Sequence, residues 1–145
     1  MGQLLLFLFL LVSLTSCSTT PVRLADSSPV MVKRLSPEFA KYSSPAPNIG
    51  KVIVIRDRGL TGGAGLAEFY LDGKRMATLT TIEALILYLP KGEYDLVVTP
   101  ETGSPSTQPG YRTAHLLVEP EKEYYFRISV SLLRRLALEP TVPME

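Results

Sequence analysis

Apolar and polar residues follow one another in three different patterns along the chain. A predominantly apolar run covers Leu4 to Leu14, a Pro- and Ser-rich stretch extends to about residue 49, and short segments rich in β-branched and aromatic residues fill the remainder. In this last part, Gly, Pro and Asp separate the segments about every 8 to 12 residues, a spacing typical of all-β domains. The pattern therefore predicts about seven short strands after Gly50.

The first strands have the clearest patterns. Lys51 to Arg56 is a continuous aliphatic run, which predicts a strand buried on both faces. Leu66 to Asp72 alternates between apolar and polar residues, which predicts a strand with one buried face. Asp72-Gly73 then predicts a type I′ hairpin turn, because both central residues of that turn need positive φ. Lys74 to Leu79 is the expected return strand.

The second half of the chain predicts four further strands, which are Glu83 to Leu89, Tyr94 to Thr99, Arg112 to Glu119 and Glu123 to Ser131. Pro90-Lys91-Gly92 supplies a tight turn, and Pro120-Glu121-Lys122 predicts a hairpin between the last two strands. Leu136 to Glu139 is ambiguous and is a candidate for an edge strand. We expect a small antiparallel β-sandwich over residues 50–139, followed by a tail over 140–145.

Residues 18 to 49 are predicted to form a linker. Prolines recur too evenly for a long helix or a central strand, at Pro21, Pro29, Pro37, Pro45 and Pro47. A flexible chain of this length reaches roughly 30 Å, which would hold the domain clear of a membrane surface. Within it, Ser36 to Tyr42 has an N-cap serine and a proline at the first helical position, which favour one or two helical turns that dock through Phe39 and Tyr42.

The amino terminus has the pattern of a lipoprotein signal. The run from Leu4 to Leu14 has 11 residues, whereas a helix needs about 20 to cross a hydrocarbon core. Leu14-Thr15-Ser16-Cys17 resembles the lipobox of bacterial lipoproteins. The resemblance implies that residues 1–16 are removed and that Cys17 receives a diacylglyceryl thioether and an acylated amino group. Ser18, in place of the Asp that favours inner-membrane retention, implies the periplasmic face of the outer membrane.

Two other interpretations of the amino terminus stay open. Met1-Gly2-Gln3 contains no Lys or Arg, which a signal peptide's first region normally carries. An ordinary secretory signal or anchor, or a buried cytosolic helix, are the alternatives. A myristoylation signal fits poorly, since Leu6 stands where that motif has Ser or Thr.

Composition limits the function classes further. The 145 residues leave room for one domain, and 15 Lys and Arg against 14 Asp and Glu give no field that favours nucleic acid. Cys17 is the only cysteine, so no internal disulfide forms. There is one histidine and no tryptophan. His115 has no Cys, Asp or Glu beside it at ligand spacing, so we expect it to be structural or merely exposed, with no metal, cofactor or catalytic residue.

Two groups of residues are candidates for binding. Arg56 and Arg58 carry basic charge, as do Arg134-Arg135, and are expected to be solvated or to contact anionic envelope polymers or lipid headgroups. Arg56 has a structural alternative, which is to hold the Gly59–Gly65 loop through hydrogen bonds. That loop lacks the Lys of a phosphate-binding loop and is expected to be a flexible connection.

Three tyrosines form the second group. Tyr70, Tyr88 and Tyr125 occupy outward positions of their predicted strands. They would bind a glycan or a partner if they formed an aromatic strip, and would otherwise pack over one face of the sandwich.

Several elements in order resemble the bacterial lipoprotein-associated domain of unknown function 2846. The matching segments are Val52–Arg56, Gly59–Gly65, Phe69–Lys74, Leu89–Tyr94 and Glu123–Phe126. The resemblance covers about residues 45–131 and implies a β-sandwich in the cell envelope, with no established reaction, cofactor or catalytic residue.

These observations predict a non-enzymatic structural or protein-binding module, lipid-anchored to the outer membrane through Cys17. The competing expectations are an envelope carbohydrate-binding accessory, a small enzyme, and a small-ligand or inhibitor domain.

Overall fold

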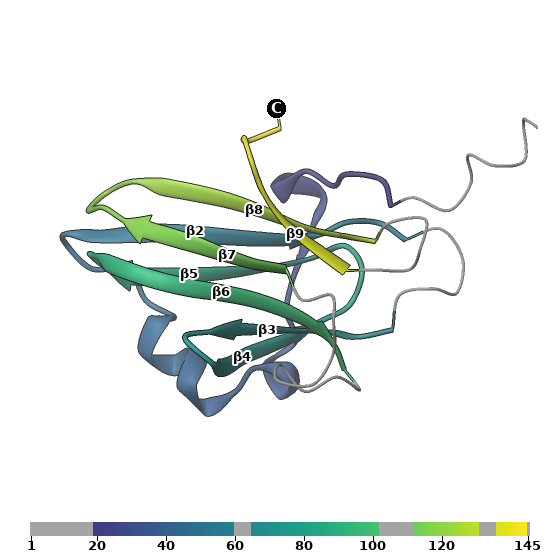
Figure 1. Cartoon of the computed structure of the whole chain (residues 1–145), viewed down its shortest axis with the longest axis horizontal. Coiled ribbons are helices and arrows are strands. Elements are labelled where there is room, and N and C mark those ends of the chain that lie inside the picture. The colour runs from purple at the N-terminus through teal and green to yellow at the C-terminus, as the bar shows by residue number, and fades with distance from the viewer. Residues whose placement is uncertain (1–18, 60–64, 102–111, 131–135, 145) are drawn as a thin grey trace, which may run out of the picture.

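The computed structural model describes residues 19–59, 65–101, 112–130 and 136–144, which form two β-sheets packed face to face (Figure 1). The five-stranded sheet has the order β1-β5-β2-β8-β9, and the four-stranded sheet has the order β4-β3-β6-β7. The predicted all-β sandwich is confirmed, with nine strands in the described residues. The strands are β1 (Ser28–Pro29), β2 (Ile49–Arg56), β3 (Ala67–Leu71), β4 (Lys74–Leu79), β5 (Glu83–Pro90), β6 (Gly92–Pro100), β7 (Arg112–Val118), β8 (Glu123–Val130) and β9 (Leu136–Thr141).

Strand β2 lies at the centre of the five-stranded sheet and is buried on both faces, as its aliphatic run predicts. Val52 and Val54 point into the main core between the sheets, where they meet residues such as Phe69 of β3. Ile53 and Ile55 point the other way, into a second apolar cluster on the outside of the sheet. Burial of each such side chain contributes about 1.5 to 3 kcal/mol. An outer cluster of this kind requires a covering segment.

The β3–β4 hairpin follows the expected turn chemistry. Asp72 has φ 48° and Gly73 has φ 74°, so both central residues lie in the left-handed region that a type I′ turn requires. Leu71 pairs with Lys74 on either side of the turn. Ala67, Phe69 and Leu71 are buried, which confirms the predicted inward face of β3.

The expected hairpin around Pro120-Glu121-Lys122 is wrong. Strand β7 pairs with β6 in the four-stranded sheet, whereas β8 pairs in parallel with β2 in the other sheet. The turn therefore carries the chain across the core from one sheet to the other. Both strands have apolar inward residues, such as Leu116 and Phe126, and this alternation is the same for a hairpin and for a connection between sheets. Because β1–β5 is also parallel, the sandwich is mixed rather than purely antiparallel.

The ambiguous segment after residue 135 is an edge strand. Strand β9 pairs with β8 from Leu136 through Thr141, so it continues past the expected end at Glu139. Pro140 lies inside it. A strand at the edge of a sheet tolerates proline because one side of its backbone needs no partner strand.

The predicted free linker is wrong for residues 19–42, which lie against the sandwich. Val22 and Val30 are 6 % and 7 % exposed, and Ser28–Pro29 forms β1 beside β5. The same stretch contains three 3₁₀ helices, which are η1 (Leu24–Asp26), η2 (Val32–Arg34) and η3 (Pro37–Tyr42). Their turns provide backbone hydrogen bonds within this proline-rich stretch. We call residues 19–43 the N-terminal strap. Regular prolines exclude long helices, but they do not prevent single apolar residues from being buried.

The docking of η3 agrees with its predicted role. Proline occupies its first turn, and Phe39 and Tyr42 pack against the main core. Ser36 precedes the helix without making a side-chain capping bond. No helix among the described residues has the length and apolar character needed to cross a membrane.

A glycine in β2 allows the sandwich to close at one end. A Cβ at Gly50 would lie 2.5 Å from Val118 Cγ1 and 2.8 Å from the Glu119 carbonyl oxygen. We expect Gly50→Ala to lower the free energy of unfolding by about 1 to 3 kcal/mol, because the neighbouring backbone must move. A Cβ at Gly65 would meet nothing within 4 Å, so Gly65→Ala should change stability by less than about 0.5 kcal/mol. Urea unfolding followed by circular dichroism measures both, and equal stability of the two variants would contradict the prediction.

Candidate functional site

The two outer faces of the sandwich differ. The strap covers the outside of the five-stranded sheet, where Val22 packs with Ile53, Ile55 and Ala84. Leu24, Ile86 and Tyr125 pack around this cluster. On the four-stranded sheet, the outward residues of β6 and β7 include the exposed Glu93, Asp95 and His115, and the half-buried Val97. This second face is therefore the candidate for contact with another molecule.

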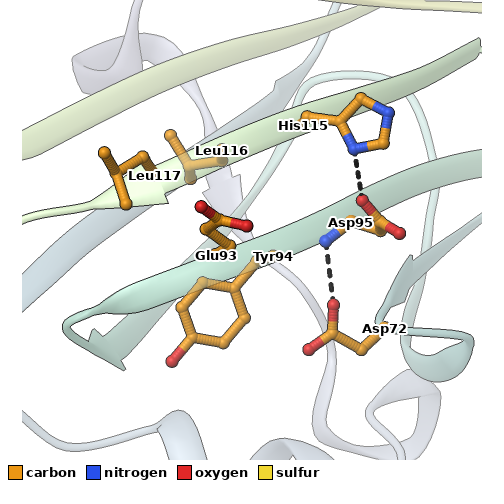
Figure 2. A pocket seen from close by; sticks show the side chains of 7 residues that line it. All are labelled: Asp72, Glu93, Tyr94, Asp95, His115, Leu116 and Leu117. Carbon is orange, nitrogen blue, oxygen red and sulfur yellow. Dashed lines mark hydrogen bonds and ion pairs between the residues drawn. The ribbon is translucent and has the colours of Figure 1, made fainter.

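A shallow recess lies on this second face, at the end near the β3–β4 turn (Figure 2). Its volume is about 550 Å³, and its lining residues are Asp72, Glu93, Tyr94, Asp95, His115, Leu116 and Leu117. We call it the acidic recess. The strand register explains it, because Asp95 is the cross-strand partner of His115 and Glu93 is that of Leu117. Directly paired residues of antiparallel strands have neighbouring side chains on the same face.

His115 and Asp95 form the polar centre of the acidic recess. The Nδ1 atom of His115 lies 2.5 Å from Oδ1 of Asp95. The backbone N–H of Asp95 donates to Oδ1 of Asp72 over 2.8 Å, and the backbone N–H of Asp72 donates to the Asp95 carbonyl over 2.9 Å. These bonds fix the β3–β4 turn beside β6. The side chains of His115 and Asp95 are 82 % and 56 % exposed, so solvent screens their attraction strongly.

The residues that line the acidic recess carry acidic, aromatic, imidazole and apolar side chains. A His–Asp pair supports acyl transfer when it activates a nucleophile, and the residues lining the acidic recess include no Ser, Cys or Lys. Among the described residues, no group of three or more His, Cys, Asp or Glu side chains is arranged to hold a metal ion. What the recess offers is three carboxylates, from Asp72, Glu93 and Asp95, next to the exposed side chain of Leu117.

The predicted exposure of His115 is confirmed, and the structure adds a carboxylate neighbour, Asp95, that does not stand beside it in the sequence. Asp95 is 20 residues away in the sequence. The sequence pattern places both Asp95 and His115 on the outward faces of their strands. Knowing in addition that β6 and β7 pair in this register would have predicted their contact.

The three candidate tyrosines do not form one strip. Tyr70 lies on β3 of the four-stranded sheet, whereas Tyr88 and Tyr125 lie on β5 and β8 of the other sheet. The hydroxyl of Tyr70 donates to Glu68 Oε2 over 2.8 Å, and burial raises the pKa of Tyr70. Tyr125 packs against the apolar cluster under the strap. The packing interpretation therefore holds for Tyr125, and the shared aromatic strip is wrong.

Arg56 is a structural residue. Its side chain is buried, with Nη1 donating to the Leu79 carbonyl over 2.5 Å and Nη2 donating to the Gly65 carbonyl over 2.6 Å. Burial lowers the pKa of Arg56 to about 10, and the nearby charge of Glu83 opposes that shift. The guanidinium stays charged at neutral pH and holds the strand that follows the glycine-rich loop. Its predicted contact with envelope polymers is wrong, while the structural alternative is confirmed.

The neighbours of Arg56 differ from one another. Asp57 is buried beside Arg127, whose Nε lies 2.9 Å from Asp57 Oδ2, and burial raises the pKa of Asp57. Arg58 is exposed, so its contact with anionic groups stays a prediction. Cys17, Ser18 and Arg134-Arg135 lie outside the described residues, as does most of the glycine-rich loop.

Comparison with protein-family models gives no match, and comparison with curated proteins gives none either. The resemblance to the domain of unknown function 2846 therefore stays a prediction from the segments between residues 45 and 131.

Proposed function

We propose that this chain is a lipoprotein of the outer membrane whose sandwich binds an envelope protein that presents Lys or Arg side chains. The observation that carries the binding proposal is the acidic recess on the face that the strap leaves uncovered. The membrane location is supported by the lipobox-like Leu14-Thr15-Ser16-Cys17 behind a short apolar run.

Charge at the recess favours a cationic partner. The whole chain has a net charge of only +1, but the recess gathers Asp72, Glu93 and Asp95 around one histidine. Farther along the same face, Glu68 is already paired with Arg75 over 3.3 Å. A local excess of negative charge attracts a partner surface that carries positive charge, and it fixes the orientation of that partner on binding. Leu117, which is 58 % exposed, adds an apolar contact of the kind found inside interfaces.

Crosslinking in intact envelopes, followed by affinity capture of the tagged protein, tests this proposal. We expect the double variant Glu93→Lys, Asp95→Lys to recover about tenfold less of the crosslinked partner, because like charges then face each other. Glu101→Lys is the matched control, since Glu101 is exposed but lies at the opposite end of β6. The control should capture the partner at the wild-type level, and higher salt should weaken capture by the wild type. Equal recovery by the double variant and the wild type would exclude the recess as the binding surface.

A further inference from the structure

The chain is tied to the sandwich almost immediately after Cys17. Thr20 and Arg58 exchange two backbone hydrogen bonds, each with an N···O distance of 2.9 Å. The hydroxyl of Thr19 accepts a hydrogen bond from the backbone N–H of Val130 over 3.1 Å and lies 3.5 Å from Asp57 Oδ2. These contacts connect the start of the strap to the ends of β2 and β8. The first described residue, Thr19, is therefore already fixed to the sandwich.

This position leaves very little tether. Only Ser18 separates Cys17 from Thr19, and an extended backbone spans at most about 3.6 Å per residue. The Cα atoms of Cys17 and Thr19 are therefore at most about 7 Å apart. Each headgroup layer of a bilayer is itself about 5 to 8 Å thick. A domain whose Cys17 carries acyl chains in the membrane thus has Thr19 at the headgroup surface.

The strand directions define which end of the sandwich this is. Strands β2 and β8 run parallel and end at Arg56 and Val130, next to Thr19, and both run toward the right of Figure 1. Strand β6 ends at the same side, because Pro100 pairs with Ala67 at the start of β3 and Arg56 reaches the Gly65 carbonyl. We call this the anchored end. The distal end carries the Asp72-Gly73 turn, Lys91 and the Glu119–Lys122 turn.

At the anchored end, the described residues expose charges of both signs. Arg58 and Glu101 are exposed there. The acidic recess lies toward the distal end. Glu93 is seven residues before Pro100 on β6, which places it about 23 Å farther along the strand. A membrane at the anchored end therefore does not meet the carboxylates of the acidic recess.

We propose that the sandwich stands on the membrane, with its anchored end against the lipid headgroups and its distal end pointing away. The inference rests on the proposed lipidation of Cys17. The anchored end then contacts a lipid surface, and the acidic recess faces partners away from the bilayer.

Fluorescence quenching on vesicles tests the orientation. The acylated protein is reconstituted in vesicles of phosphatidylethanolamine and phosphatidylglycerol that contain a headgroup-attached quencher. Single cysteines are introduced by Glu101→Cys at the anchored end and by Lys91→Cys at the distal end, both at exposed positions. Cys17 is the only natural cysteine and its sulfur is blocked in the thioether, so each dye reports one site. We expect several-fold stronger quenching at residue 101, and equal or reversed quenching overturns the orientation.

A tether insertion serves as the control. Twenty Gly and Ser residues placed between Ser18 and Thr19 provide a reach of roughly 25 Å, so the difference between the two dyes should largely disappear. If the difference persists unchanged, the short tether is not its cause and the argument fails. Intact-mass measurement separates the two proposals. A mature chain without acyl groups overturns both the anchor and the orientation, whereas equal quenching of an acylated chain overturns the orientation alone.

Discussion

Replacing Cys17 with Ser is expected to move the protein from the membrane fraction to the soluble periplasm. Two or three acyl chains hold a protein firmly, since each buried methylene contributes about 0.8 kcal/mol. The hydroxyl of Ser cannot form the thioether. The run from Leu4 to Leu14 is too short to replace the lost anchor as a membrane span, and the described residues contain no spanning helix. Fractionation, together with incorporation of labelled palmitate, measures the change.

Ser18→Asp is the control that separates attachment from sorting. This variant keeps Cys17, so it should retain the acyl label and stay in membranes while shifting from the outer to the inner membrane. Density-gradient separation of the two membranes detects that shift. Membrane retention of the Cys17→Ser protein without any acyl label would contradict the lipoprotein proposal.

The strand positions were predictable because their causes are local. Alternation along Leu66 to Asp72 marks one buried face, and the positive φ values at Asp72 and Gly73 follow from the residues themselves. The continuous aliphatic run of β2 likewise required burial on both sides. Each of these features depends on residues within a few positions of one another.

Strand pairing and the strap were not predictable, because they depend on distant partners. Alternation on β7 and β8 is compatible with a hairpin and with a connection between sheets, and only packing across the core selects the second. Val22 and Val30 are single apolar residues among prolines, so their burial gives no periodic signal. The outer face of β2 required a cover, since Ile53 and Ile55 point away from the main core. That requirement was the available evidence against a free linker.

The candidate site shows the same division between local and distant causes. A hydrogen-bonding role for Arg56 was expected beside the glycine-rich loop, but its complete burial follows from β4, which supplies the Leu79 carbonyl. The acidic recess depends on register, because Asp95 and His115 meet only when β6 and β7 pair as they do. No single segment of the sequence contains that information.

Arg56→Met is expected to lower the free energy of unfolding by about 1 to 3 kcal/mol. Methionine fills much of the space and removes the cost of burying a charge, which is the cost that lowers the pKa of Arg56 to about 10. It also removes both donors, so the carbonyls of Leu79 and Gly65 lose their hydrogen bonds. A polar group that loses its partner in a buried site costs about 1 to 3 kcal/mol. Leu79 is buried, so its carbonyl bears this cost, whereas Gly65 is exposed and its carbonyl can bond water instead.

Arg58→Met is the matched control, because it makes the same chemical change two residues away at an exposed position. It should alter stability by less than about 0.5 kcal/mol. Arg56→Lys should fall between the two, since one ammonium keeps the charge but cannot reproduce the two-pronged geometry of the guanidinium. Urea unfolding in the soluble Cys17→Ser background measures all three without interference from lipid. Equal stability of Arg56→Met and Arg58→Met would mean that the free energy cost of burying the guanidinium cancels the free energy its hydrogen bonds contribute. In that case Arg56 does not hold the glycine-rich loop in place.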